Sequence, residues 1–341
     1  MVTVRPSDEL RALADALGAR ATLLKPLGAM TTYGVGGPAA LFVEVEGPSD
    51  LDEVRPVLAD RAGALPFFVI GRGSNLLVAD AGFDGVVVHL GAGFATLELP
   101  GPAAVGGPVV ARAGAALALP VLARRVADAG WRGRAWAVGV PGSVGGAVRM
   151  NAGGHGSDMA SCLVRYRWAD LLGPGGGTDE LATLDYGYRS SSVMPTQLVL
   201  GADLRVVQGS ATEEQAEVAA IVKWRRENQP GGANAGSVFT NPEDDSAGRL
   251  IDEAGLKGFG IGTAHVSEKH ANFIQADRGG RADDVRAVME HVRTVVAARC
   301  GITLRTEVRL LGFGGEETDA VPDPERPTVS RPDVSRPGGA P

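Results

Sequence analysis

Hydrophobic positions in the first part of the chain follow two different spacings. Over residues 7–17 leucine recurs every three to four residues, which predicts a short amphipathic helix. A second helix is predicted over residues 119–129, because Gly130 follows the apolar pattern as a stop signal. Three other runs are short, apolar and rich in β-branched or aromatic side chains, as is typical of strands: residues 41–45, 66–70 and 86–90.

The second part of the chain begins with strand-like patterns and ends with helical ones. Residues 163–207 indicate mainly strands and turns, with residues 173–177 as a hairpin connection. Residues 212–227 predict a charged helix with a capping box formed by Ser210 and Glu213 at its start. The clearest helical stripe has apolar residues at positions 285, 288, 289, 292, 295 and 296. Alternation over residues 304–310 predicts a final strand.

Domain boundaries are placed where these patterns and the composition change. Residues 1–20 are assigned to an N-terminal helix, residues 21–208 to a first domain and residues 209–315 to a second domain. Residues 316–341 hold six of the 21 prolines and few large apolar side chains, so we expect a disordered tail.

Overall composition and charge exclude several classes of protein. Apolar residues make up 44% of the 341 residues, which is enough to fill a core. No apolar run approaches the ~18 residues of a membrane span, and the first ten residues lack the apolar block of a signal peptide. A net charge of −7 disfavours nucleic acid as a partner, and Cys162 and Cys300 are too few for a disulfide framework. We expect a cytoplasmic, monomeric globular protein.

Glycine is the unusual component, because 49 of the 341 residues are glycine where ~7% is usual. The glycines follow no Gly-X-Y period and gather in loops, chiefly residues 71–76 and 139–156. Several glycines in a loop let backbone N–H groups approach a phosphate, so two such loops suggest a dinucleotide pyrophosphate. Turn formation alone is the alternative for any single loop. Neither a P-loop nor a complete Gly-x-Gly-x-x-Gly fingerprint is present.

Six motifs occur in order, and together they resemble the MurB family of UDP-N-acetylenolpyruvoylglucosamine reductases over roughly residues 20 to 313. The motifs are Thr31-Thr-Tyr-Gly-Val-Gly-Gly37, Gly71-Arg-Gly-Ser-Asn-Leu-Leu77, Gly139-Val-Pro-Gly-Ser-Val-Gly-Gly-Ala-Val-Arg-Met-Asn-Ala-Gly-Gly154, Ala235-Gly-Ser-Val-Phe-Thr-Asn-Pro242, Gly248-Arg-Leu-Ile-Asp-Glu-Ala-Gly-Leu-Lys-Gly258 and His265-Val-Ser-Glu-Lys-His-Ala-Asn-Phe-Ile274.

This resemblance implies an α+β fold. An FAD-binding module of the vanillyl-alcohol-oxidase or PCMH type, built from two α+β subdomains, would precede an α+β substrate domain. The implied reaction is the NADPH-dependent reduction, through non-covalent FAD, of an enolpyruvyl UDP-sugar to UDP-N-acetylmuramate for peptidoglycan synthesis. The residues expected to hold FAD are Gly71, Arg72, Gly73, Ser74, Asn75, Leu76, Pro141, Gly142, Ser143, Gly145, Gly146, Asn151 and Gly153.

Three residues match the catalytic positions of the family. Arg189 would bind the substrate carboxylate, because a guanidinium presents paired N–H groups to a carboxylate. Ser237 would donate a proton to the neighbouring carbon, and Glu307 would act best with a raised pKa that keeps it protonated. Without the resemblance, they also fit a surface arginine, a turn serine and an outward-facing strand residue. Alternation along the final strand would place Arg309 beside Glu307.

Residues for the UDP part of the substrate are expected on the second domain: Asn241, Lys269, His270 and, more weakly, Lys257, with Arg309 near the reacting group. Thr240 departs from the family pattern, because many members have lysine there. The segment from Gln229 to Ser237 is short, as in the subclass of the family that lacks an inserted loop with a substrate-clamping tyrosine. His155 has no second histidine or suitable cysteine nearby, so no metal site is expected.

Two alternatives to this reductase are open at the level of sequence. A related FAD-dependent oxidase or dehydrogenase of the same fold would act on another substrate, but an oxidase needs a base where Ser237 offers a proton donor. A nucleotide-binding module without turnover is the other alternative. A purified protein that is colourless and cannot be reconstituted with FAD would exclude both enzymes.

Deleting residues 316–341 is expected to leave activity unchanged, because a chain of this composition does not contribute to a packed site. Steady-state rates of the truncated and full chains provide the measurement. A loss of activity on truncation would show that the tail takes part in function.

Overall fold

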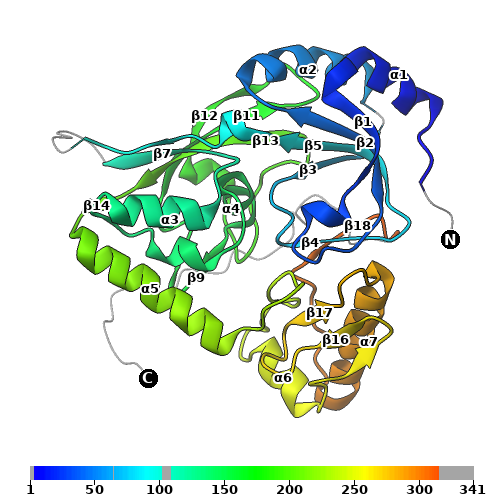
Figure 1. Ribbon diagram of the computed structural model, residues 1–341, viewed down its shortest axis with the longest axis vertical. Helices are drawn as coiled ribbons and strands as arrows, with labels where there is room; N and C mark the ends of the chain where they lie inside the picture. The colour runs from blue at the N-terminus through cyan, green and yellow to red at the C-terminus, as the bar shows by residue number, and fades with distance from the viewer. Residues whose placement is uncertain (1–3, 64, 102–108, 315–341) are drawn as a thin grey trace.

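The computed structural model describes residues 4–63, 65–101 and 109–314, which fold into three mixed units (Figure 1). The predicted tail lies outside these ranges. Within them, no helix is both long enough and apolar enough to cross a membrane.

The first unit is a four-stranded sheet in the order β1-β2-β5-β3. Its strands are β1 (Ala21–Pro26), β2 (Pro38–Val45), β3 (Phe67–Ile70) and β5 (Phe83–Leu90). β1 is antiparallel to β2, whereas β2, β5 and β3 are parallel. Helices α1 (Asp8–Leu17) and α2 (Pro48–Arg61) lie over it (Figure 1), and the predicted leucine stripe of α1 faces the core. The three apolar strands predicted from sequence form β2, β3 and β5, three of the four strands of this sheet.

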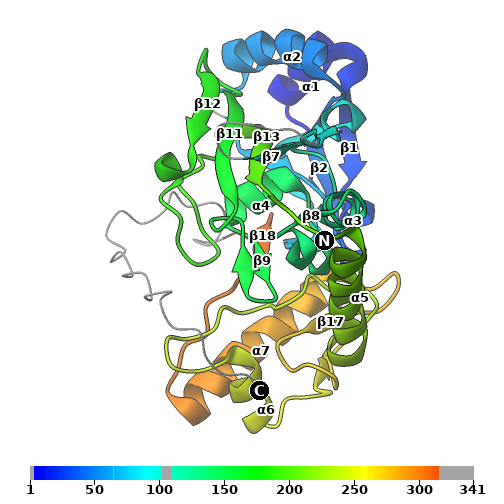
Figure 2. The same cartoon turned by 90° about the vertical axis from the view of Figure 1, so that its left-hand side faces the viewer.

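An antiparallel five-stranded sheet forms the second unit, in the order β12-β11-β13-β7-β6 (Figure 2). Its strands are β6 (Leu97–Glu98), β7 (Val110–Gly114), β11 (Leu163–Asp170), β12 (Gly176–Glu180) and β13 (Gln197–Arg205). The helices of this unit are α3 (Leu119–Asp128) and α4 (Val144–Met150). The connection between β11 and β12 confirms the predicted hairpin at residues 173–177.

The third unit packs two helices on a small antiparallel sheet (Figure 1). Its elements are α6 (Ala247–Glu253), β15 (Gly260–Ile261), β16 (Ala264–Val266), β17 (Ile274–Ala276) and α7 (Ala282–Cys300). The stripe predicted for α7 is confirmed, since five of its six apolar residues are buried: Val285, Val288, Met289, Val292 and Val296. Gly301 ends the helix in the left-handed conformation, with a φ of 71°.

Two contacts attach the third unit to the first. After α7 the chain returns, and β18 (Arg309–Leu311) pairs in parallel with β4 (Leu76–Val78). The Asp80 carboxylate accepts hydrogen bonds from the backbone N–H groups of Ala282 and Asp283, at 2.9 and 3.2 Å. A carboxylate at the start of α7 also complements the helix dipole. These contacts fix the third unit against β4 and the residues that follow it.

Helix α5 (Ala211–Asn228) connects the second and third units and packs on the second. Its Val218 and Ile221 are buried in the core shared by the first two units. Ser210 precedes the helix as expected, but its side chain makes no capping hydrogen bond, so the predicted capping box is wrong. The core of the third unit contains no buried residue of α5 and combines residues from Ala235 onward with Tyr33, Val35 and Leu77.

The predicted strand over residues 304–310 is mostly wrong. Only Arg309–Leu311 forms a strand, because its parallel partner β4 is three residues long. Thr306 makes an isolated bridge to Phe239 instead. The remaining short elements are β8 (Trp131–Arg132), β9 (Gly153–Gly154), β10 (Ser157–Asp158), β14 (Val207–Gln208) and 3-10 turns at Gly18–Arg20, Gly28–Met30, Ala92–Phe94, Ala135–Gly139 and Leu181–Leu184.

Candidate active site

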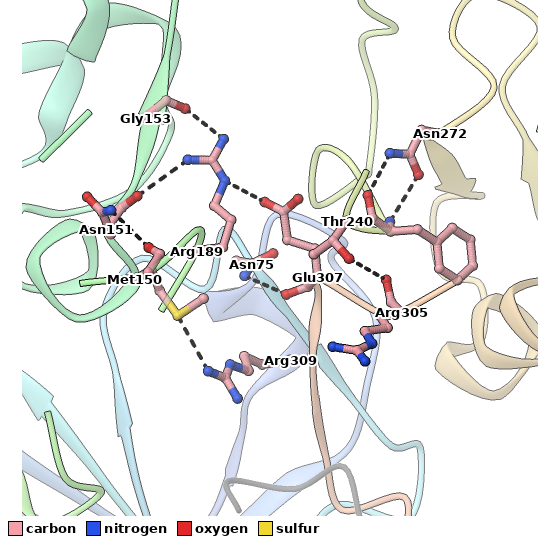
Figure 3. A network of polar contacts seen from close by, with 12 residues as sticks. Asn75, Met150, Asn151, Gly153, Arg189, Thr240, Asn272, Arg305, Glu307 and Arg309 are labelled. Atoms are coloured by element: carbon pink, nitrogen blue, oxygen red, sulfur yellow. Dashed lines mark hydrogen bonds and ion pairs between the residues drawn. The ribbon is translucent and has the colours of Figure 1, made fainter. Parts of the chain in front are cut away.

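Arg189 lies at the tip of a tight turn between β12 and β13. Gly187 and Ser190 exchange backbone hydrogen bonds across this turn, and Arg189 has a φ of 55°. A left-handed conformation is uncommon for a residue with a side chain, so the surroundings must hold it in place. The turn directs the guanidinium toward the third unit (Figure 3).

Glu307 lies opposite the guanidinium and pairs with it (Figure 3). The Nε of Arg189 donates to Oε1 of Glu307 at 3.0 Å, and the two residues are 118 positions apart in the chain. The terminal nitrogens of Arg189 donate to the carbonyl oxygens of Gly153, at 3.0 Å, and Asn151, at 3.4 Å. Three of the five guanidinium N–H groups are thus in use, and one on each terminal nitrogen is left for a further acceptor.

The carboxyl group of Glu307 is mostly buried, with 14% of its side chain exposed. Burial raises its pKa above the ordinary glutamate value, because the charged form loses hydration; the charge and hydrogen bond of Arg189 oppose this effect but do not cancel it. The protonated form therefore persists to a higher pH than in an exposed glutamate. Glu307 is therefore not the outward-facing strand residue that was the alternative from sequence.

Ser237 lies in the loop between α5 and α6, and the next residue, Val238, contacts the backbone of Glu307. The carbonyl oxygen of Val238 accepts a hydrogen bond from the backbone N–H of Glu307 at 2.8 Å. Gly236 adopts a φ of 78°, which glycine tolerates without strain and which turns the chain just before Ser237. Within the described chain, the half-buried Ser237 hydroxyl has no hydrogen-bond partner, so it is available to a bound molecule.

The two glycine-rich loops approach each other closely. A Cβ on Gly71 would lie 2.6 Å from Oγ of Ser143, and a Cβ on Gly142 would lie 3.3 Å from Oγ of Ser74. Arg72 also donates from Nε to the carbonyl oxygen of Pro141 at 3.3 Å. A side chain at Gly71 would displace the Ser143 hydroxyl, which caps α4 by accepting from the N–H of Gly146.

A cavity of about 420 Å³ lies between the first two sheets, beside these loops. Five of the residues predicted to hold a cofactor line it: Gly71, Arg72, Ser143, Gly145 and Gly146. The other predicted residues do not line it: Gly73, Ser74, Asn75, Leu76, Pro141, Gly142, Asn151 and Gly153. Its volume lies within the ~300–1,000 Å³ of typical small-molecule pockets.

Much of the cavity wall comes from segments that carry no motif. Glu46 and His89 follow or end the central strands of the first sheet, and Ala115, Val193 and Val199 come from the second unit. Among these residues, His89 could have been noticed from sequence, because it is a single histidine at the end of an apolar run. Its Nδ1 lies 3.0 Å from the carbonyl oxygen of Ile70. The other positions become neighbours only when the two sheets face each other.

The residues predicted for the UDP part of the substrate do not contact the Arg189–Glu307 pair. Oδ1 of Asn241 accepts a hydrogen bond from the N–H of Ala247 at 3.1 Å, and Nζ of Lys269 donates to the carbonyl oxygen of Arg226 at 2.5 Å. Burial lowers the pKa of His270, which favours its neutral form. Their role in binding stays a prediction.

Arg309 and Lys257 have other neighbours than those expected. The nearest polar contact of the Arg309 guanidinium is the sulfur of Met150, at 3.9 Å, and no contact with Glu307 is formed (Figure 3). Lys257 forms an ion pair with Asp252 at 2.6 Å. Within the described ranges, no three His, Cys, Asp or Glu side chains gather as a metal site would require.

Two family models match parts of the chain. Residues 39–173 match a family model described as an FAD binding domain. Residues 228–311 match the model for the C-terminal domain of UDP-N-acetylenolpyruvoylglucosamine reductase. The first matched range includes strands of both sheets that enclose the cavity, and the second contains Ser237 and Glu307.

Proteins named UDP-N-acetylenolpyruvoylglucosamine reductase resemble the chain over most of its length. The protein from Heliobacterium modesticaldum is 41% identical over 302 residues, which cover 86% of this chain and 92% of the relative. The Bacillus subtilis protein is 38% identical over 296 residues, covering 84% and 93%. The crystal structure of the reductase (MurB) from Thermus caldophilus is 34% identical, with a TM-score of 0.72 over 85% of this chain and 98% of that one.

The matches confirm the predicted α+β fold, with an FAD-binding module and a C-terminal reductase domain. They also agree with the family resemblance predicted from the six sequence motifs. The chain belongs to the family of UDP-N-acetylenolpyruvoylglucosamine reductases, which are FAD-dependent oxidoreductases.

Proposed function

We propose that Arg189, Ser237 and Glu307 are the groups with which this chain reduces the enolpyruvyl ether of a UDP-sugar to UDP-N-acetylmuramate. The observation that carries the proposal is the contact between the arginine of the second unit and the glutamate that follows the third. Reduction of an enolpyruvyl group adds a hydride to the terminal carbon and a proton to the carbon beside the carboxylate. The site must therefore bind a carboxylate, stabilise developing negative charge and supply a proton.

The residues around the cavity suit FAD. Backbone atoms of the glycine-rich loops reach the cavity without intervening Cβ atoms, and apolar side chains such as Val193 and Val199 offer a dry surface for a ring system. Glu46 also lines the cavity, and its carboxylate suits a hydroxyl or amino group rather than a phosphate. When bound, FAD supplies the hydride that originates from NADPH.

Arg189 holds the substrate carboxylate in this proposal. Two of its N–H groups have no acceptor among the residues that the structure describes, and they can donate together to one carboxylate. As hydride arrives, negative charge moves toward that carboxylate, and the fixed cation stabilises the charge more strongly than it stabilises the ground state. The Arg189 contacts to Gly153 and Asn151 keep the guanidinium in place before substrate binds.

Ser237 donates the proton to the carbon beside the carboxylate. A hydroxyl is a weak acid, and the transfer is favourable only because the carbanion-like substrate is a much stronger base. Ser237 precedes Val238, whose carbonyl oxygen accepts a hydrogen bond from the N–H of Glu307, and this contact supports the assignment of Ser237 to the same site. No His or Asp hydrogen bond activates this serine within the described chain, so a hydrolytic role has no support.

Glu307 is proposed to act in its protonated form. A neutral carboxyl group beside the substrate carboxylate avoids repulsion between two anions, and burial favours that form. Its proton is lost as the pH rises through the raised pKa. The rate of substrate reduction is therefore expected to fall on the alkaline side of the pH profile.

Replacing Glu307 with Gln tests this assignment. E307Q keeps a neutral group at every pH, so the variant is expected to react more slowly than the parent but without the alkaline fall that Glu307 causes. The measurement is the rate of substrate reduction at each pH, with E227Q on the exposed face of α5 as control. An unchanged alkaline limb in E307Q would assign the titration to another group.

Domain organisation and assembly follow from the same contacts. We propose that the FAD-binding part extends through α5 and that the substrate part begins near residue 228, because Val218 and Ile221 belong to the first core. We also propose a monomer, since one chain supplies all three catalytic candidates. The two free cysteines suit a reducing compartment, and we propose the cytoplasm.

Product analysis tests the proposed reaction. Incubation with NADPH and the enolpyruvyl UDP-sugar is expected to consume both in equal amounts and to give a product two hydrogen atoms heavier. NADPH consumption that occurs equally without the UDP-sugar, together with hydrogen peroxide formation, would instead support the alternative of an oxidase of the same fold.

A further inference from the structure

Each of the three catalytic candidates stands beside an asparagine that holds its backbone. Asn151 is the first of these. It is 7% exposed and has a φ of 41°, and its Nδ2 donates to the carbonyl oxygen of Gly187 at 3.0 Å. Its Oδ1 accepts from the N–H of Ala160 at 3.0 Å. The amide side chain thus connects the end of α4 to the turn whose tip is Arg189 (Figure 3).

Two further contacts join α4 to the same turn. The hydroxyl of Tyr186 donates to the carbonyl oxygen of Val148 at 2.6 Å, and the hydroxyl of Ser191 donates to the carbonyl oxygen of Arg149 at 2.5 Å. The last carbonyl groups of a helix lack partners within the helix. Here the segment that carries Arg189 supplies those partners, so the end of α4 and the turn form one connected structure.

Asn272 holds the backbone that follows Ser237 in the same way. It is 3% exposed, its Nδ2 donates to the carbonyl oxygen of Phe239 at 2.8 Å, and its Oδ1 accepts from the N–H of the same residue at 3.0 Å. Its own carbonyl oxygen accepts from the N–H of Val238 at 2.8 Å. One buried residue therefore makes three hydrogen bonds to the two residues that follow Ser237.

Asn75 has the same relation to Glu307. Its Nδ2 donates to the carbonyl oxygen of Glu307 at 3.0 Å, and its own carbonyl oxygen accepts from the N–H of Arg309 at 3.0 Å (Figure 3). These bonds join the first glycine-rich loop to the backbone of Glu307, 232 positions away in the chain.

We propose that Asn75, Asn151 and Asn272 are positioning residues, each fixing the backbone from which one reactive side chain projects. This inference rests on the proposed roles of Arg189, Ser237 and Glu307. The physical reason is that a misplacement of about 1 Å at a reacting group can slow a reaction ~10²-fold. Asn75 and Asn151 belong to the two glycine-rich loops, so the same loops that approach the cofactor also hold the arginine–glutamate pair.

Removing the amide groups tests the proposal. N151G keeps the left-handed backbone available, and N272D keeps the acceptor for Phe239 while removing the donor. Anaerobic stopped-flow then gives two rate constants on the same bound flavin: its reduction by NADPH and its reoxidation by the enolpyruvyl UDP-sugar. Each variant is expected to lower the ratio of reoxidation to reduction by about 10- to 100-fold.

Double variants separate positioning from a general structural role. N151G is expected to slow the parent but to add no further slowing in an R189A background, and N272D is expected to add none in an S237A background. N228A is the control, because Asn228 donates a similar hydrogen bond to the carbonyl oxygen of Trp224 on α5, away from the site.

The outcomes distinguish this inference from the function on which it rests. Two results would overturn the positioning roles alone. One is additive slowing in the double variants. The other is an unchanged ratio of flavin reoxidation to reduction in N151G and N272D, while R189A and S237A reoxidise their flavin much more slowly. Normal reoxidation in R189A and S237A would overturn the proposed function itself. If N151G does not fold, N151D provides the same comparison with the Ala160 contact retained.

Discussion

S237A is expected to reduce its flavin with NADPH at nearly the parent rate but to reoxidise it with substrate about 10²- to 10⁴-fold more slowly, the range typical of a lost proton donor. The reason is that, in the proposed mechanism, Ser237 acts only after hydride transfer to the substrate begins, whereas reduction of the flavin by NADPH requires no proton from this hydroxyl. The half-buried hydroxyl has no protein partner in the described chain, so its removal leaves no buried donor or acceptor unsatisfied.

The measurement is flavin absorbance in anaerobic stopped-flow, with the two half-reactions recorded separately. S210A is the matched control, because Ser210 precedes α5 and its side chain makes no capping hydrogen bond. Equal losses in both half-reactions of S237A would count against a role as proton donor and would point to damage of the cofactor site instead.

R189A is expected to slow the reoxidation of the flavin by substrate about 10²- to 10³-fold. This is the range typical of enzymes that lose one group stabilising charge in the transition state. Loss of the cation also removes the influence that lowers the Glu307 pKa, so Glu307 should stay protonated to still higher pH. The alkaline fall of the pH profile is therefore expected to move upward in R189A.

R189K is the companion variant for this experiment. Lysine keeps the charge but lacks the planar fork, and it cannot reproduce the contacts with Glu307, Gly153 and a substrate carboxylate together. We expect an intermediate rate. Unchanged turnover in R189A would refute the carboxylate-binding role, and a parent-like R189K would show that charge alone is sufficient.

Local patterns predicted the helices and central strands correctly because these elements depend on spacing within one segment. The stripe of α7 and the leucines of α1 each face a core that their own periodicity defines. The final strand was overestimated because its length depends on β4, whose residues lie 233 positions before their partners in β18. No local pattern around residues 304–310 contains that information.

The site was only partly accessible from sequence. The resemblance selected Arg189 and Glu307, but their ion pair joins positions 118 apart and depends on the left-handed turn at Arg189. Asn272 lies within a recognisable motif, yet nothing in that motif indicates contact with the Ser237 loop. Apart from His89 and Gln197, the cavity residues from β5 and β13 are ordinary apolar strand residues, which become neighbours only when the two sheets face each other.

The most direct test of the central claim is the order of colour changes in one anaerobic mixing experiment. The purified FAD-bound protein is expected to lose its flavin absorbance when NADPH is added and to regain it when the enolpyruvyl UDP-sugar follows, with UDP-N-acetylmuramate as the product. A flavin that stays reduced after the UDP-sugar is added, and regains its colour only when oxygen is admitted, would contradict the reductase assignment.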